Sequence, residues 1–224
     1  MSTSKREPLI DCVRFLAILL MIVFHFIYDL NFFGIKLLPQ NVILFWKWLP
    51  RLIVFLFMLA VGMSISLKRD GALTRSFHKS QVKIALGALA ISIVTYIIYP
   101  NRWIYFGTLH CIFFARYIVA FISQKPKLNL LLFFAINVPL FFGFEYPWVT
   151  LPHLSMDYIP LFPWVSYAFL GLYLGRNRIV FTRKTIGENK VVMKISSLSF
   201  WIYLIHQPVL FGLSYVIYYF LKSS

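Results

Sequence analysis

The chain has 224 residues, of which 60% are hydrophobic and 13% are charged, and its mean hydropathy is +0.78. A soluble domain is typically about half apolar and about one quarter charged, so the composition excludes an ordinary water-soluble protein and indicates an integral membrane protein. The formal net charge of +15 would suggest nucleic-acid binding in a soluble protein. In a membrane protein, the positions of the charges along the chain matter more.

Seven apolar segments, bounded by polar or proline-containing loops, follow one another along the chain. A transmembrane helix needs about 20 residues, so the length suits seven helices and leaves no room for a soluble domain. None of the segments alternates strictly, which excludes barrel strands and predicts an all-α fold, a single transmembrane domain over residues 1–224. The predicted spans are 9–29, 42–67, 82–99, 103–122, 129–144, 159–175 and 195–220.

The distribution of Lys and Arg predicts the orientation of these spans. With a cytoplasmic N-terminus, the outer loops hold three cations, Lys36, Arg102 and Lys222. The inner loops then hold fifteen: Lys5, Arg6, Lys68, Arg69, Arg75, Lys79, Lys83, Lys125, Lys127, Arg176, Arg178, Arg183, Lys184, Lys190 and Lys194. Because cytoplasmic loops are rich in cations, we expect an extracytoplasmic C-terminus and a location in a cytoplasmic (inner) membrane. The expected partner of the charge is anionic lipid rather than nucleic acid.

Polar side chains in the first span fall on one face. At 100° per residue, Asp11, Arg14, His25 and Asp29 lie within an arc of about 60° that runs about 27 Å along the helix. Charged groups in a bilayer are costly, so the stripe predicts a functional surface that faces the protein interior. Two structural alternatives stay open: Asp11 and Arg14 could pair at the membrane surface, and His25 could be a satisfied interior histidine.

The last span has a second polar stripe, followed by Pro208, which should break or kink the helix. Its members are Ser196, Ser199, Tyr203, His206 and Gln207. The alternative is that the Ser and Tyr side chains join neighbouring helices.

Three further polar residues, Arg51, His110 and Asp157, are expected at middle-to-outer depth. Histidines at one depth can bind a metal ion, but no HxxxH or HxxE pairing supports such a site and no cysteine lies at that depth. We therefore expect no metal and favour acid–base chemistry, because imidazole titrates near neutral pH. Gly171 and Gly175 form a pair typical of close helix packing.

Four segments together resemble the bacterial members of the heparan-alpha-glucosaminide N-acetyltransferase catalytic-domain family, within a broader group of transmembrane acyltransferases. They are Asp11 to Leu30, Tyr105 to Ile112, Asp157 to Trp164 with Gly171 and Gly175, and Trp201 to Pro208. Two features depart from the family pattern. Phe15 stands where a glycine is common, and Ile195 to Ser199 replaces a glycine-arginine-x-serine stretch.

The resemblance implies transfer of an acetyl or acyl group from cytoplasmic acetyl-CoA to an amine or hydroxyl, with a carbohydrate as the favoured acceptor on the outer side. His25 would be the base, supported by Asp29, and His206 or His110 would be a second acid–base group. Cofactor binding is expected at Arg14, Asp11 and Arg176, because arginine binds phosphate in a bidentate manner. Acceptor binding is expected at Asp157, Trp164, Gln207, Arg51 and Tyr203.

Two other functions stay open. The same polar stripe could be the pathway of a small-molecule transporter or proton-coupled carrier, although we find no inverted repeat. The chain could also be an inactive family member that serves as a partner subunit. Its oligomeric state, including a homo-oligomer, is left open by the sequence.

Overall fold

A computed structural model describes residues 7–68, 71–177 and 189–223. All regular elements in these ranges are helices, which confirms the all-α prediction. Of the cations used to predict the orientation, Lys5, Arg6, Arg69, Arg178, Arg183 and Lys184 lie outside the described residues. The chain packs into two compact units, one made of residues 1–56 and 184–224 and the other of residues 57–183.

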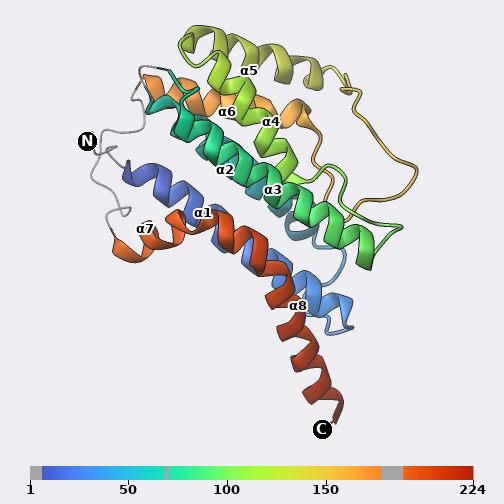
Figure 1. Ribbon diagram of the computed structural model, residues 1–224. Helices are drawn as coiled ribbons and strands as arrows, with labels where there is room; N and C mark the ends of the chain where they lie inside the picture. Colours follow the sequence, from blue (N-terminus) through green and yellow to red (C-terminus); the bar gives the residue numbers. More distant parts are fainter. Residues whose placement is uncertain (1–6, 69–70, 178–188, 224) are drawn as a thin grey trace. The chain divides into compact units, whose positions relative to one another are not determined.

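The first unit is built on two helices that run in the same direction. It contains α1 (Pro8–Phe32), the π-helical turn η1 (Leu44–Trp48), the start of α2 (Leu49–Ser66), α7 (Lys190–Ser197) and α8 (Ser199–Ser223). Figure 1 shows α1 and α8 side by side. Contacts advance together along both helices, from His25 with His206 to Phe33 with Phe211, so α1 and α8 are parallel.

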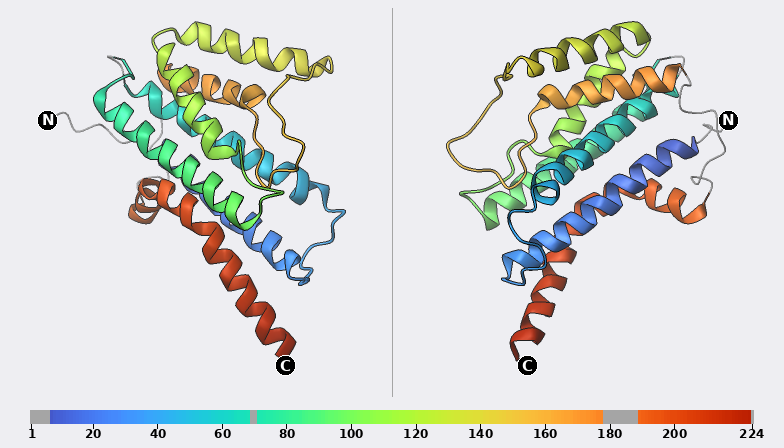
Figure 2. Two further views of the ribbon diagram at one scale, coloured as in Figure 1. Left: turned by 45° about the vertical axis from the view of Figure 1, so that its right-hand side comes forward. Right: turned by 180° about the vertical axis from the view of Figure 1, so that it is seen from behind.

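The second unit contains the rest of α2 and four further helices, α3 (Arg75–Ile98), α4 (Thr108–Phe121), α5 (Pro126–Phe141) and α6 (Leu161–Arg176). Within it, α6 packs against α4 and α5, and α3 packs against α4. Both views of Figure 2 show α5 and α6 side by side. Gly143, just past the end of α5, has a φ of 78°, which suits the left-handed turn that ends this helix.

Close packing of α2 on α6 depends on glycines, as predicted for Gly171 and Gly175. A Cβ atom added at Gly171 would overlap the carbonyl of Leu59, and one at Gly175 would overlap the side chain of Ser66. Gly62 of α2 meets the backbone of α6 at Ala168 in the same way. The absent side chains let the two backbones approach each other.

Four helices are long and apolar enough to cross a membrane: Pro8–Phe32, Leu44–Ser66, Arg75–Ile98 and Ser199–Ser223, each of 23 to 25 residues. The helices α4, α5 and α6 have 14, 16 and 16 residues. The structure thus supports an integral membrane protein, while seven spans and the orientation stay predictions.

The fourth span differs from its prediction because the helix begins at Thr108 rather than near residue 103. The preceding segment is held by side chains of α3: Ser92 donates to the Ile104 carbonyl, and the Ile104 amide donates to Thr95 Oγ1. The Ile159 amide also donates to the carbonyl of Phe106. These bonds take the place of helical hydrogen bonds in this segment. The apolar run therefore begins several residues before the helix does.

The last predicted span, 195–220, is divided at Leu198 into α7 and α8. Ser197 donates its hydroxyl to the Lys194 carbonyl and Ser196 donates to Asp11, so serine side chains compete for local hydrogen bonds here. In contrast, α8 continues through Pro208 to Ser223, and Figure 1 shows a change of direction along it. Pro208 therefore kinks the helix without ending it.

Replacing Gly171 by alanine should destabilise the second unit. The new methyl group would meet the Leu59 backbone, which cannot rotate away, so we expect a loss of about 1–3 kcal/mol. Thermal unfolding in detergent would show it as a lower Tm. Gly212→Ala is the control, because a Cβ atom there meets nothing within 4 Å. Equal Tm changes in the two variants would contradict the close packing of α2 and α6.

Candidate functional site

The first unit brings together five of the predicted site residues, from α1 and α8. The rings of His25 and His206 are in edge-to-face contact, with centroids 4.9 Å apart and planes at 63°. The Tyr203 ring lies 5.6 Å from that of His206. One turn further along α1, Asp29 is hydrogen-bonded to Gln207. We call His25, Asp29, Tyr203, His206 and Gln207 the histidine cluster.

His206 has a defined tautomer in this arrangement. Its Nδ1 atom lies 2.7 Å from the carbonyl oxygen of Tyr203, and a carbonyl can only accept, so Nδ1 carries the proton. The Nε2 atom is then the basic nitrogen of the neutral ring. It is buried and has no hydrogen-bond partner among the described residues. A buried nitrogen with an unused lone pair is suited to accept a proton from a bound substrate.

Asp29 is 1% exposed, and its Oδ1 atom accepts a hydrogen bond of 2.9 Å from Gln207 Nε2. Its Oδ2 atom and Gln207 Oε1 are both buried without a partner in the part of the chain that the structure describes. A charge-assisted hydrogen bond of this kind ties α1 to α8. Asp29 therefore positions α8, and its predicted support of the His25 ring is not a direct hydrogen bond within the described residues.

Asp11 lies at the other end of α1 from the histidine cluster. It is buried, and its Oδ1 atom accepts a hydrogen bond of 2.6 Å from Ser196 Oγ in α7. Arg14 follows one turn later and is half-buried. This pair, predicted to bind the cofactor, thus lies where α1 meets α7.

Arg51 is exposed, near the start of α2, and binds within its own helix. Its Nη1 atom donates to the Lys47 carbonyl at 2.6 Å, and its guanidinium lies 5.7 Å from the ring centre of Trp48. Its role in acceptor binding stays a prediction.

In the second unit, Asp157 caps the N-terminus of α4. Its Oδ2 atom accepts from the Thr108 amide at 2.8 Å, and Oδ1 accepts from the Thr108 hydroxyl at 3.4 Å. A carboxylate is stabilised at this position by the free amides and the positive end of the helix dipole. Gly107 leaves room for it, because a Cβ atom there would meet the carboxylate.

His110 is in the first turn of α4, and both its ring nitrogens contact protein groups. The Gly107 amide donates to Nδ1 at 3.2 Å, and Nε2 lies 3.1 Å from Ser92 Oγ. Because Nδ1 accepts, Nε2–H donates to Ser92, whose hydroxyl donates in turn to the Ile104 carbonyl. These bonds fit a positioning role for His110 better than the acid–base role predicted for it.

Two other predicted residues lie on α6. Trp164 is half-buried, with its ring 5.8 Å from that of Tyr167. Arg176 ends the helix and donates from Nη2 to the carbonyl of Lys68 at 2.9 Å. Arg116 was not among the predicted site residues, although a charged residue in an apolar segment is a signal of function. The structure shows it bonded to Gln81 and Ser80 of α3.

No group of three or more His, Cys, Asp or Glu that could hold a metal ion occurs in the described ranges. The histidine cluster offers two imidazoles and one carboxylate, and that carboxylate is bound to an amide. These side chains suit proton transfer, which needs only one positioned nitrogen.

Replacing Gln207 by leucine should destabilise the first unit, because Asp29 would lose its donor while it stays buried. We expect a loss of about 1–3 kcal/mol, since the bond involves a charged group. Thermal unfolding in detergent would measure it, with Gln40→Leu in an exposed loop as the control. Adding Asp29→Asn to Gln207→Leu should restore part of the loss. If Gln207→Leu is no more harmful than Gln40→Leu, the bond does not hold the helices together.

Comparison with curated proteins finds no match, and comparison with solved structures finds none either. One family model does match, over residues 6–208, and its description is the catalytic region of heparan-alpha-glucosaminide N-acetyltransferase. The match includes all of the histidine cluster and both ends of the second unit. It confirms the predicted family and implies acetyltransferase activity. The chain belongs to the heparan-alpha-glucosaminide N-acetyltransferase catalytic family.

Proposed function

We propose that the protein transfers an acetyl group from cytoplasmic acetyl-CoA to an amine or hydroxyl of a carbohydrate on the extracytoplasmic side. The observation that carries the proposal is the contact between His25 and His206 in the histidine cluster, beside the buried Asp29. The matched family is an acetyltransferase family, and its name specifies the amine of a glucosaminide as an acceptor.

Acetyl transfer requires one proton to move. The acceptor nitrogen or oxygen attacks the thioester carbonyl and gives up a proton, the carbon–sulfur bond breaks, and the CoA sulfur leaves as a thiolate that takes a proton. A histidine can accept the first proton and return it to the sulfur, so the reaction needs no other acid or base. His206 Nε2 meets this requirement directly, because Nδ1–H is bound to Tyr203 and Nε2 has its lone pair.

His25 is the second imidazole of the site, and its edge-to-face contact brings it within reach of the same substrate. There are therefore two candidates for the base: His25, for which the sequence predicted this role, and His206. In either case the neighbouring ring borders the reacting atoms and excludes water from them. Gln207, whose Oε1 atom is buried and without a partner in the described residues, can accept a hydrogen bond from an acceptor hydroxyl or amine.

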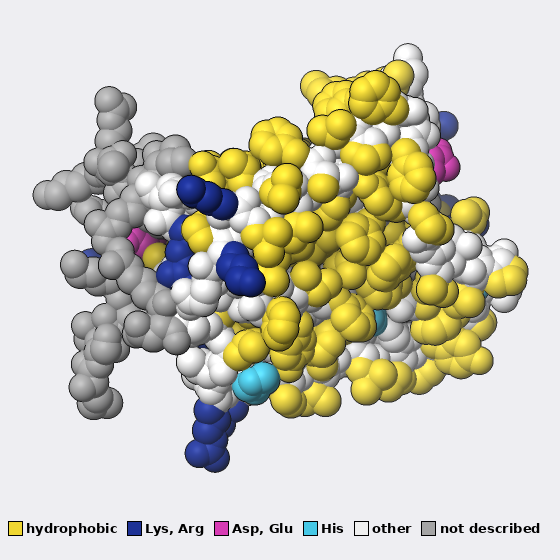
Figure 3. Space-filling view, turned by 90° about the horizontal axis from the view of Figure 1, so that it is seen from above, with side chains coloured by type: hydrophobic (Ala, Val, Ile, Leu, Met, Phe, Trp, Pro, Cys, Tyr) yellow, Lys and Arg dark blue, Asp and Glu magenta, His cyan; other side chains and the backbone are white. Residues whose placement is uncertain are grey.

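The parallel course of α1 and α8 supports the proposed topology. If both cross the membrane in the same direction, the number of crossing helices from α1 to α8, both included, is odd, which agrees with seven. Within the second unit, cations lie at helix ends that meet: Lys68 follows α2, Arg75 begins α3, Lys125 precedes α5 and Arg176 ends α6. In Figure 3, most of the visible Lys and Arg lie at one end of a face covered mainly by hydrophobic side chains, and a few lie at the opposite edge beside an acidic side chain.

We expect His25→Ala and His206→Ala each to lower kcat for acetyl transfer by about 100-fold or more, because each removes an imidazole from the reacting centre. His78→Ala is the matched control, since His78 is exposed and its ring contacts Tyr117 in the second unit. The assay follows radiolabelled acetyl transfer from acetyl-CoA to glucosamine by purified protein in detergent. The base is the histidine whose loss also removes the acidic limb of the pH–rate profile.

Two results would contradict the proposal. Full activity in His25→Ala and His206→Ala would exclude the histidine cluster as the reacting centre. No transfer by the wild type to any amine or hydroxyl sugar, with CoA still bound, would favour an inactive member of the family.

A further inference from the structure

The short helix α7 lies beside the start of α1 in the first unit. It packs against α1, and Ser196 Oγ donates a hydrogen bond of 2.6 Å to Oδ1 of Asp11, which belongs to the first turn of α1. Because α1 is long and apolar enough to cross a membrane, its first turn marks one surface of the bilayer. The helix α7 is therefore level with that surface.

The length of α7 is too small for a membrane span. Its 8 residues extend about 12 Å, whereas the hydrocarbon core of a bilayer is about 30 Å thick. Figure 1 shows α7 at an angle to α8, which follows it. The start of α7 is capped, since Asn189 Oδ1 accepts a hydrogen bond of 2.8 Å from the Val191 amide. A helix this short is marginal in water and depends on the surfaces that it contacts.

The side chains of α7 form two different faces. Val192 and Ser196 are buried, and they make up the face turned toward α1. Val191, Ile195 and Leu198 are spaced by four and three residues, so they share a second face, which is apolar. On this face Val191 is 61% exposed and Leu198 is 41% exposed. The described part of the chain thus leaves an apolar face of α7 uncovered.

Two lysines border this apolar face. Lys190 and Lys194 are both exposed and lie four residues apart, on one side of α7. A helix with an exposed apolar face bordered by lysines is typical of helices that lie in the plane of a membrane surface. The apolar side chains enter the acyl-chain region, and the lysine ammonium groups reach the headgroups. The helix itself contains no acidic residue, and Glu188, before its cap, lies outside the described residues.

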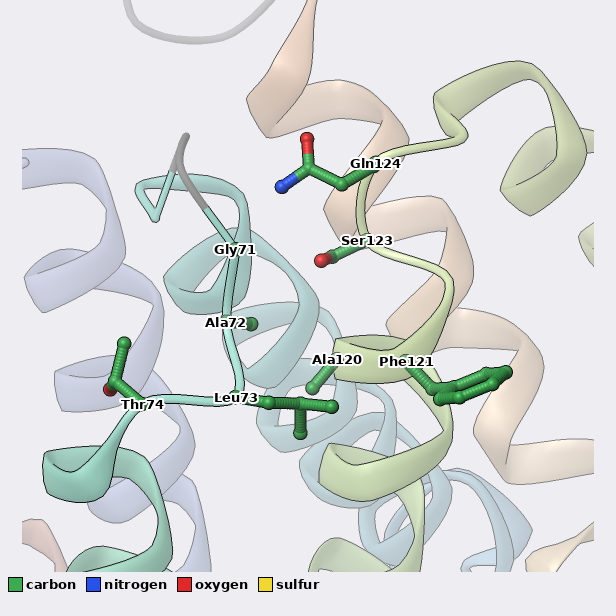
Figure 4. Close-up of a pocket in the computed structure, with 8 residues that line it drawn as sticks. All are labelled: Gly71, Ala72, Leu73, Thr74, Ala120, Phe121, Ser123 and Gln124. Carbon is green, nitrogen blue, oxygen red and sulfur yellow. The ribbon is translucent and has the colours of Figure 1, made fainter.

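An open hollow of about 240 Å³ in the second unit has a different character. It lies between the segment Gly71 to Thr74 and the end of α4 (Figure 4). The described residues that line it are all uncharged, so they offer an anion no cation. The exposed surface of α7 combines the two features that match an anionic phospholipid, since it has apolar side chains for the acyl chains and lysines for the headgroup.

We propose that α7 lies in the plane of the membrane surface and binds anionic phospholipid. Val191, Ile195 and Leu198 contact the acyl chains, and Lys190 and Lys194 contact the headgroup phosphate. The buried face of the same helix is bonded to the first turn of α1, so bound lipid stabilises that end of α1. This inference does not depend on the proposed acetyl transfer.

A fluorescent label on α7 tests its position, in the full-length protein in phosphatidylcholine nanodiscs. The label is attached to Val191→Cys in a Cys12→Ser background, because Cys111 is buried. Ser197→Cys is the matched control, because Ser197 is exposed on the far side of the lysines from the apolar face. Quenching by a lipid with a doxyl group near its headgroup, relative to quenching by acrylamide in water, should be stronger for the label at position 191.

An equal or reversed ratio at the two positions would place the apolar face in water and overturn the inference. A label at position 191 that neither agent quenches would overturn it too, because the face would then be covered by protein, such as a second copy of the chain.

The choice of lipid is tested with the same doxyl group carried by phosphatidylglycerol or by phosphatidylcholine at equal mole fraction. Phosphatidylglycerol should quench the label at position 191 about twice as strongly or more, because two lysines concentrate anionic lipid around α7. Lys190→Gln with Lys194→Gln should remove this preference. Lys125→Gln with Lys127→Gln should keep it, because this control removes two exposed lysines at the start of α5 with the same change in net charge. A preference that is absent without these changes, that survives Lys190→Gln with Lys194→Gln, or that both double variants lose equally would overturn the binding of anionic lipid by α7.

Discussion

The hydrogen bond between Asp29 and Gln207 is the interaction on which the candidate active site depends. A carboxylate that is 1% exposed among apolar helices needs a donor, and the donor available is the amide of Gln207 on α8. The bond fixes the register of the two parallel helices. In that register His25, one turn before Asp29, lies beside His206, the residue before Gln207. The buried carboxylate thereby determines which imidazoles meet.

In the second unit, too, charged side chains are held by polar partners from other segments. There Asp157 binds the amide and hydroxyl of Thr108, and Arg116 binds Gln81 and Ser80, so that each charged group joins segments distant in the sequence. Between α2 and α6, glycine allows the backbones to approach. Polar side chains that sequence analysis selects as functional are therefore often the groups that also hold the helices together.

Hydropathy predicted the helical fold and the membrane location, because apolar length alone decides them. It could not locate the start of α4 or the break at Leu198, since side-chain hydrogen bonds from Ser92, Thr95 and Ser197 decide these boundaries. Helical spacing placed His25 and Asp29 on one face, yet it could not show that Asp29 binds Gln207. The approach of Lys68 and Arg116 to the ring of Phe77 also depends on contacts between distant segments.

In the proposed reaction, the acetyl group passes from a donor on one side of the membrane to an acceptor on the other. The most direct test uses sealed proteoliposomes, because neither acetyl-CoA nor glucosamine crosses the bilayer readily. With labelled acetyl-CoA inside and glucosamine outside, we predict acetylated glucosamine in the external medium. With both compounds outside, we predict none, whichever way the protein is inserted. Product in the second arrangement, or none in the first by protein that binds CoA, would contradict the account.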